Sequence, residues 1–120
     1  MNKEPFLDQA INWARSKGYN NSLKVSNAEG YEEPKSFLNK TTNTEVVPDM
    51  TFVTASGGKH YTEIALKSDQ AQDLVTKWKF LAVMASMKQG KLHLLAPRGH
   101  KSFVTTLVDK YNIDAIVHSV

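Results

Sequence analysis

Two acidic residues and one lysine fall on two short apolar runs in the middle of the chain, and together they could act on a phosphate ester. Asp49 follows Pro48 and opens the first run, and Glu63 and Lys67 lie on the second. Carboxylate oxygens are ligands that Mg²⁺ prefers, and an ammonium group stabilises charge on an attacking or leaving oxygen. We therefore expect Asp49 and Glu63 to bind Mg²⁺, or Mn²⁺ as a substitute, and Lys67 to join them in catalysis.

A β-hairpin must position these side chains. The apolar and β-branched residues at 49–55 and 60–67 predict two strands, and the Gly-Gly pair within 56–59 predicts the turn between them. Successive side chains of a strand point to opposite faces. In the second strand one face therefore receives Glu63, Ala65 and Lys67.

The length of the hairpin loop decides whether Asp49 reaches that face. A two- or four-residue loop centred on Gly57-Gly58 would place Asp49 opposite Leu66, on the face away from Glu63. An odd loop, a bulge or a kink at Pro48 would turn Asp49 to the same side as Glu63. Glycine pairs favour bulges, so both arrangements stay open at this point.

The rest of the chain alternates helical and strand patterns. A helix is expected over 5–17 and a long helix from a capping box at Asp69 and Gln72 to Gly90. The polar stretch 20–47 contains strand-like pieces. The remaining expected elements are strand pieces near 23–25 and 36–38, a strand over 92–95, a basic loop over 97–100, a helix over 102–111 and a strand over 113–117. The order α-β-β-β-α-β-α-β predicts an α/β sandwich with a mixed central sheet.

This element order, together with Pro48-Asp49 and the acid and lysine of the second strand, resembles the PD-(D/E)xK nuclease superfamily, which includes restriction endonucleases and Holliday-junction resolvases. The resemblance covers most of the chain. It implies one restriction-endonuclease-like domain over residues 1–120. It also implies a metal-dependent DNA endonuclease or a resolvase-like phosphodiester hydrolase.

The second half of the motif departs from the family pattern. If Lys67 and Ser68 are aligned with its end, Ala65 stands in the position of the acid. If Glu63 is the acid, Ala65 stands in the position of the lysine. In a third arrangement the site has migrated, and Glu63 and Lys67 lean toward one ion from either side of Ala65. The alternative function is therefore a catalytically inactive nuclease-fold domain that acts in nucleic-acid binding or protein assembly.

The distribution of charge favours a polyanionic partner. The net charge is +3, and residues 59–101 contain eight basic and three acidic side chains. The resemblance implies DNA. The residues expected to contact it lie on the long helix and in the loop before the next helix, where free N–H groups suit phosphate. They are Lys77, Lys79, Arg98, His100 and Lys101.

Composition narrows the remaining possibilities. Cysteine is absent, which excludes disulfides and thiol nucleophiles, and the four histidines lack the spacing of a zinc site. No apolar run is long enough to span a membrane, so we expect a cytoplasmic protein without a membrane partner. A second apolar stripe on the long helix predicts a homodimer. Its residues are Phe80, Val83 or Met84, and Met87.

Overall fold

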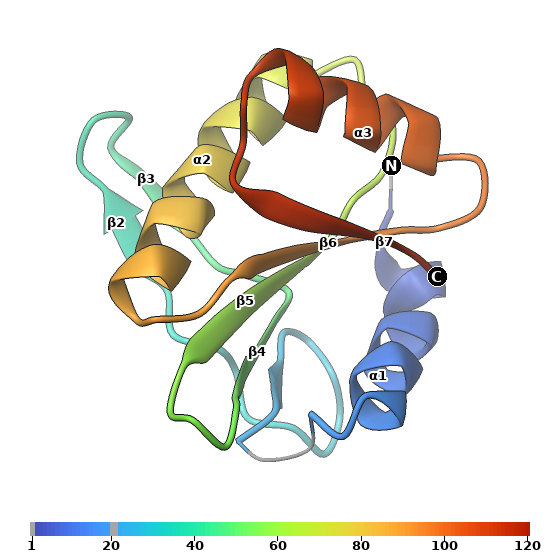
Figure 1. The fold of residues 1–120 in the computed structure, drawn as a ribbon, viewed down its shortest axis with the longest axis vertical. Coiled ribbons are helices and arrows are strands. Elements are labelled where there is room, and N and C mark those ends of the chain that lie inside the picture. The colour runs from blue at the N-terminus through green and yellow to red at the C-terminus, as the bar shows by residue number, and fades with distance from the viewer. Residues whose placement is uncertain (1, 20–21) are drawn as a thin grey trace.

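A mixed five-stranded sheet forms the centre of the protein and carries helices on both faces (Figure 1). The structure, a computed structural model, describes residues 2–19 and 22–120. The coarse expectation of an α/β fold with a mixed sheet is confirmed. The elements are the 3₁₀ helix Glu4–Phe6, α1 (Leu7–Ser16), β1 (Lys24–Val25), β2 (Phe37–Asn39), β3 (Thr44–Val46), β4 (Met50–Val53), β5 (Lys59–Ile64), α2 (Ala71–Met87), β6 (Leu92–Ala96), α3 (Lys101–Lys110) and β7 (Ala115–Ser119).

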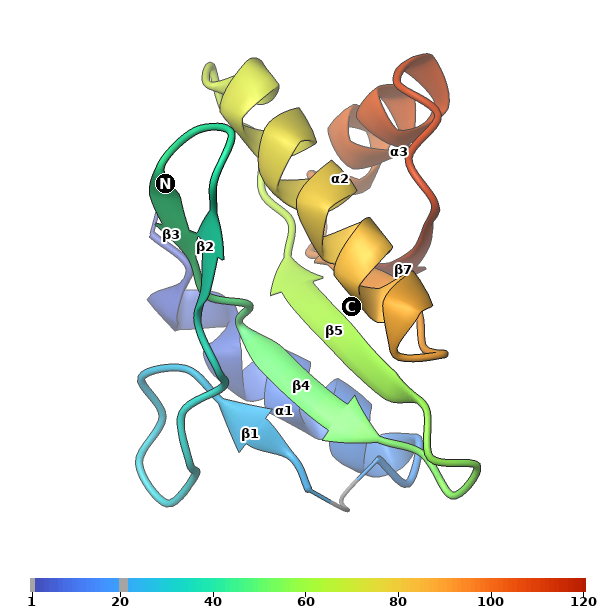
Figure 2. The ribbon, with the colours of Figure 1, turned by 90° about the vertical axis from the view of Figure 1, so that its left-hand side faces the viewer.

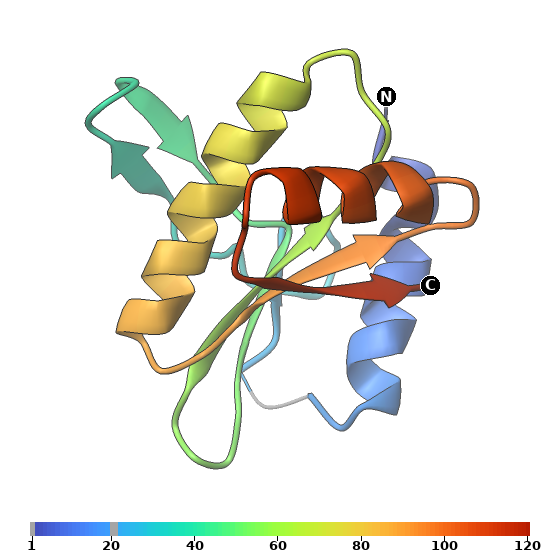
Figure 3. The same cartoon turned by 45° about the horizontal axis from the view of Figure 1, so that its top comes forward.

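The strands of the central sheet follow the order β1-β4-β5-β6-β7. β1, β4 and β5 pair antiparallel, whereas β5, β6 and β7 pair parallel. Parallel neighbours need a crossover, and α2 and α3 supply the two crossovers. Both helices lie on the same face of the sheet, and α1 covers the other (Figures 2 and 3). The carboxyl ends of β5 and β6 therefore meet at one edge.

A separate hairpin of β2 and β3 lies beside α2 (Figure 2). β2 matches the expected strand piece, but β3 was not expected. The hairpin interrupts the chain between β1 and β4, which nevertheless pair with each other. Phe37 of β2 packs against Phe80 of α2, with 6.3 Å between the ring centroids. Part of the second apolar stripe of α2 is therefore covered by this hairpin.

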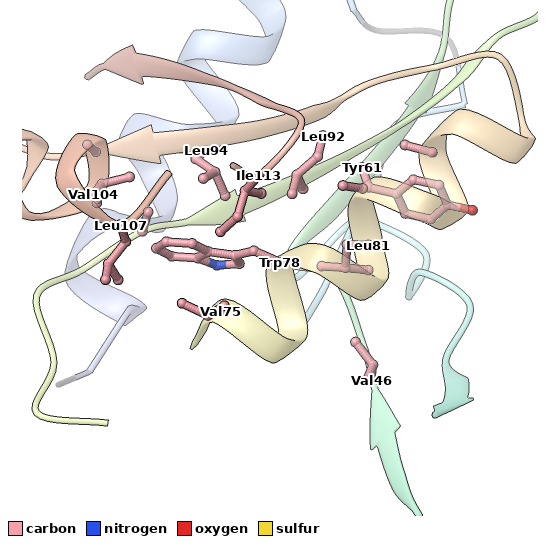
Figure 4. Close-up of a cluster of buried hydrophobic side chains, with 14 residues drawn as sticks. Val46, Tyr61, Val75, Trp78, Leu81, Leu92, Leu94, Val104, Leu107 and Ile113 are labelled. Atoms are coloured by element: carbon pink, nitrogen blue, oxygen red, sulfur yellow. The ribbon is translucent and has the colours of Figure 1, made fainter. Parts of the chain in front are cut away.

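Two buried clusters hold the helices to the sheet. On the face of α2 and α3, Trp78 is 1% exposed and lies among residues of both helices and the sheet (Figure 4). α2 buries Val75, Trp78, Leu81 and Ala85, whose spacing of three to four residues places them on one helix face. On the other face, Trp13 of α1 packs over Phe52 of β4. No helix in the described ranges is long and apolar enough to cross a bilayer.

Two boundaries near the acid pair differ from expectation. The second strand of the central hairpin was expected to reach Lys67, but β5 ends at Ile64. α2 begins at Ala71, and its N-cap is Gln70 rather than Asp69, without a side-chain cap. Ser68 instead accepts a hydrogen bond from the N–H of Gln70 at 2.9 Å. The capping box predicted from Asp69 and Gln72 is therefore wrong, because the chain turns before it enters the helix.

Candidate active site

A hairpin loop with an odd number of residues places Asp49 on the same face of the sheet as Glu63. Val53 pairs with Lys59, and the N–H of Thr54 donates to the carbonyl of Gly58, so three residues, 55–57, form the turn. Gly57 has φ 91°, a left-handed conformation that glycine adopts without steric cost. The register Met50 to Thr62 then extends by one residue to Asp49 opposite Glu63. Of the two arrangements left open by the sequence, the one with both acids on the same face is found.

Backbone amides fix both carboxylates. Asp49 Oδ2 accepts a hydrogen bond from the N–H of Ile64 at 2.8 Å. Glu63 Oε2 accepts one from the N–H of Asp49 at 2.9 Å. The Glu63 side chain is only 1% exposed, and that of Asp49 is 17% exposed. The two acids thus hold each other across neighbouring strands, at the edge where β4 begins and β5 ends.

Two lysines bring positive charge to this acid pair. Lys3 Nζ lies 2.8 Å from Asp49 Oδ2 and 3.4 Å from Glu63 Oε1. Lys77 Nζ lies 2.9 Å from Glu63 Oε1. Lys77 reaches Glu63 because α2 covers this face of the sheet and because its neighbour Trp78 anchors the helix in the core. Two ammonium groups therefore balance two carboxylates, and we call Lys3, Asp49, Glu63 and Lys77 the charged cluster.

Burial and charge act against each other in the charged cluster. Burial, followed by the charge of Asp49, raises the pKa of Glu63, and Lys3 and Lys77 oppose this rise. Burial lowers the pKa of Lys3, but the charges of Glu63 and Asp49 outweigh it and raise that pKa above its ordinary value. The two directions disagree. The raised pKa of Lys3 favours a charged ion pair, whereas the raised pKa of Glu63 favours a protonated, neutral acid. We take Glu63 as ionised, because its oxygens face three donors, which suits a carboxylate better than a protonated acid.

Lys67 does not join the acids. Its side chain is exposed, and its backbone N–H donates to His100 Nδ1 at 2.9 Å. The expectation that Glu63, Ala65 and Lys67 share a strand face is wrong for Lys67, because β5 ends three residues before it. Ala65 is 1% exposed and lies in the core beneath α2. Glu63 is equally buried, but its oxygens contact the N–H of Asp49 and two lysines, so Glu63 is the acid of this strand that meets Asp49.

The residues expected to contact nucleic acid divide into three groups. Lys77 belongs to the charged cluster, whereas Lys79, Arg98 and Lys101 are exposed. His100 is 8% exposed, accepts the hydrogen bond from Lys67, and packs edge-on against Phe6 with ring centroids 5.9 Å apart. The ring of His100 thus joins the segment after β5 to the turn after β6 and leaves little exposed surface, and its contact with nucleic acid stays a prediction.

A groove opens beside the acid pair. Its volume is about 1060 Å³, and it lies between the N-terminal segment with α1 and the loop that follows β1. Lys3, Asp8, Asp49 and Ile64 are among its lining residues. Asp49 and Ile64 belong to the central hairpin, so the groove leads from solvent to the charged cluster.

The donor set fits a hard divalent cation only as a minimal site. Mg²⁺ is commonly held by one or two carboxylates, with water and substrate phosphate completing its shell. Asp49 and Glu63 supply two such carboxylates, and Ile64, whose backbone N–H binds Asp49, directly follows Glu63 at the end of β5. Within residues 2–19 and 22–120 no group of three acidic, histidine or cysteine side chains is arranged to hold a metal ion.

Comparison of the chain with protein-family models, curated proteins and solved structures finds no match. The sequence had indicated Asp49 and Glu63 as a pair, and it had marked Lys77 as a substrate contact. It gave no sign of Lys3, because one lysine near the chain start has no periodic or motif context. Only the packing of α1 against the sheet brings Lys3 to the acids.

Proposed function

We propose that the protein is a metal-dependent phosphodiester hydrolase that acts on nucleic acid and is similar in its site to PD-(D/E)xK nucleases. The observation that carries this proposal is the meeting of Asp49 and Glu63 at the edge where β4 begins and β5 ends. Two such carboxylates, one of them buried, need cations beside them, and the ammonium groups of Lys3 and Lys77 occupy this position in the structure. Such an arrangement suits a divalent ion next to a scissile phosphate.

Asp49 and Glu63 would hold the ion, and the Ile64 carbonyl could complete the protein part of its shell. When bound, Mg²⁺ lowers the pKa of a coordinated water and polarises the phosphoryl oxygens. Lys77 would stabilise the negative charge that develops on the phosphate oxygens, because its ammonium already lies 2.9 Å from Glu63 Oε1. In this proposal Lys77 replaces Lys67 as the motif lysine, and the site has migrated to a helix.

Positive surface charge supports nucleic acid as the substrate. Arg98 and Lys101 follow the carboxyl end of β6, which lies beside the carboxyl end of β5 and the acid pair. Lys79 is exposed on α2, two residues after Lys77. Phosphate contacts by such residues give affinity that falls steeply with salt concentration. DNA is the proposed substrate, following the family resemblance.

Cleavage assays with linear and branched DNA in the presence of Mg²⁺ or Mn²⁺ test the proposal. We expect Asp49→Asn and Glu63→Gln to abolish cleavage, because each removes a charged ligand while keeping the side-chain shape. Lys77→Met should lower the rate by about 10²–10³-fold, the range seen when one charge-stabilising donor is lost. Lys67→Met is the matched control and should cleave normally. Full activity of the Asp49→Asn and Glu63→Gln proteins would contradict the proposal.

The second candidate is an inactive nuclease-fold domain that binds nucleic acid or assembles with proteins. It is favoured by the charge balance of the cluster, since Lys3 and Lys77 already satisfy both acids. This candidate expects DNA binding without cleavage at any metal concentration. Fluorescence anisotropy at several salt concentrations distinguishes its two forms. A steep salt dependence indicates nucleic-acid binding, and absence of binding indicates a role in protein assembly.

A further inference from the structure

Lys3 lies between the two acids of the proposed metal site. Its ammonium is the only one of the two lysine groups that contacts both carboxylates, at 2.8 Å from Asp49 Oδ2 and 3.4 Å from Glu63 Oε1. An ion bound by these same two oxygens would need the space and the lone pairs that Lys3 occupies. A divalent ion beside the Lys3 ammonium would also be repelled by it. Metal and Lys3 therefore compete for one position.

Lys3 and Lys77 differ in their freedom to leave. Lys77 projects from the middle of the 17-residue helix α2, next to the buried Trp78. Lys3 belongs to the short segment before α1; the two side chains are similarly exposed, at 35% for Lys3 and 29% for Lys77, but only Lys3 is among the residues that line the groove. Movement of the Lys3 side chain into the groove would free Asp49 Oδ2 without disturbing a helix. The same movement would leave Lys77 in place beside Glu63.

We propose that Lys3 is a built-in competitor that occupies the cation position between Asp49 and Glu63 and must move into the groove before a divalent metal binds. This inference rests on the proposed metal-dependent function. When only a fraction of the molecules has the site open, the apparent dissociation constant is the intrinsic one divided by that fraction. Lys3 therefore sets the metal concentration at which the site fills, and any ligand that draws Lys3 into the groove raises metal affinity.

Isothermal titration of Mn²⁺ into the full chain tests the inference directly. Lys3→Met removes the ammonium and keeps the length of the side chain, and we expect it to bind Mn²⁺ about tenfold tighter than wild type, or more. Lys3→Arg keeps the charge and can contact both acids, so its affinity should equal or fall below that of wild type. Lys79→Met removes one exposed charge from α2, away from the acids, and should change the affinity less than about twofold.

Thermal unfolding with and without Mn²⁺ shows whether each variant is folded and gives a second readout. The metal should raise the Tm of Lys3→Met more than that of wild type, because binding stabilises the folded state by mass action. Equal Mn²⁺ affinity in wild type and Lys3→Met would overturn the competition while leaving the metal site intact. Absence of Mn²⁺ binding in both proteins would overturn the competition and the proposed metal-dependent function together.

Discussion

Glu63 is an ionisable side chain that is almost wholly removed from water. Its oxygens face Lys77, Lys3 and the N–H of Asp49, so the charge is compensated locally rather than by solvent. Buried ion pairs of this kind add little stability as a whole, but removal of one partner leaves the others buried and unpaired. At the scale of the residue, Glu63 therefore couples the chemistry of the site to the stability of the fold.

We expect Glu63→Ala to reduce the free energy of unfolding by about 3–5 kcal/mol, because it strands the Lys77 ammonium without its partner. Urea denaturation at neutral pH measures the change. Glu45→Ala removes an exposed acid from β3 and is the matched control, with an expected effect within about 0.5 kcal/mol. A loss of less than 1 kcal/mol in Glu63→Ala would show that Glu63 is not held in this ion-paired state.

The sequence predicts which acids form the site better than it predicts which lysines join them. Asp49 and Glu63 lie on strands whose alternation can be counted. The number of residues in the hairpin loop and the alignment of Glu63 or Ala65 with the acid of the motif were left open. The position of Lys67 was predicted by extending that alternation. Because β5 ends at Ile64, side chains after Ile64 no longer alternate between the two faces. Lys3 and Lys77 come from other elements, so their position depends on how helices pack on the sheet.

At the scale of the element, two glycines let the end of α2 pack against the β4–β5 hairpin. A Cβ added to Gly90 would lie 1.8 Å from the carbonyl oxygen of Lys59, and one added to Gly58 would lie 2.4 Å from that of Gln89. The backbones of the two turns are therefore in direct contact. This contact fixes where β5 begins, and through the strand register it fixes where Glu63 lies.

We expect Gly90→Ala to reduce the free energy of unfolding by about 3 kcal/mol or more, since the clash is with backbone that cannot rotate away. Gly57→Ala is the control: it has φ 91° but no atom within 4 Å of the added Cβ, so only backbone strain of about 1–3 kcal/mol applies. Urea denaturation compares the two. A Gly90→Ala protein as stable as Gly57→Ala would contradict the close packing of the two turns.

Most elements of the fold follow from the sequence, and the main omission, β3, has a physical reason. Helices α1, α2 and α3 show apolar residues at helical spacing, and β6 is a short apolar run. β3 (Thr44–Val46) contains one buried residue, Val46, so a period of two cannot be recognised there. The pairing of β1 with β4 across the β2–β3 hairpin also depends on tertiary contacts that local patterns do not encode.

At the scale of the whole molecule, the exposed apolar part of α2 is smaller than its sequence indicates. Val83 is 58% exposed and Met87 is 71% exposed, while Phe80 and Met84 pack against the core. The homodimer stays a prediction that rests on this remaining pair, together with Leu38 of β2, which is 57% exposed. Light scattering over a range of concentrations measures the mass, and a Met87→Lys variant should be monomeric throughout. A monomeric wild type at high concentration would rule out the dimer.

The two faces of the sheet have different electrostatic character. The charged cluster lies at the sheet face that α2 covers. On the face that α1 covers, three histidines on β5, β6 and β7 form a hydrogen-bonded row. His93 lies 3.1 Å from His60 and 2.9 Å from His118, measured between ring nitrogens. His60 Nδ1 also accepts a hydrogen bond from the N–H of Lys91. His93 Nε2 therefore donates to His60. Burial disfavours a charged His93, and in the neutral ring Nδ1 accepts from His118 Nε2.

We expect the free energy of unfolding to fall at acidic pH because these three histidines become protonated. Burial, followed by the charges of His118 and His60, lowers the pKa of His93 from 6.5 to about 4, and burial also lowers the pKa of the other two rings. The unfolded chain then binds more protons than the folded one between these values. The stabilisation is complete above about pH 6.5, declines as the pH falls, and is lost below about pH 4, with a total from His93 on the order of 3 kcal/mol.

The measurement is the free energy of unfolding from urea titrations between pH 4.5 and 7.5. His93→Phe removes the titrating group and keeps an aromatic ring against Trp13 and Phe52. Its stability should be lower at pH 7.5, because two hydrogen bonds are lost, but should decline less steeply than that of wild type as the pH falls. Parallel pH profiles in the two proteins would show that the pKa of His93 is the same in the folded and unfolded chain, which contradicts the lowering of this pKa by burial.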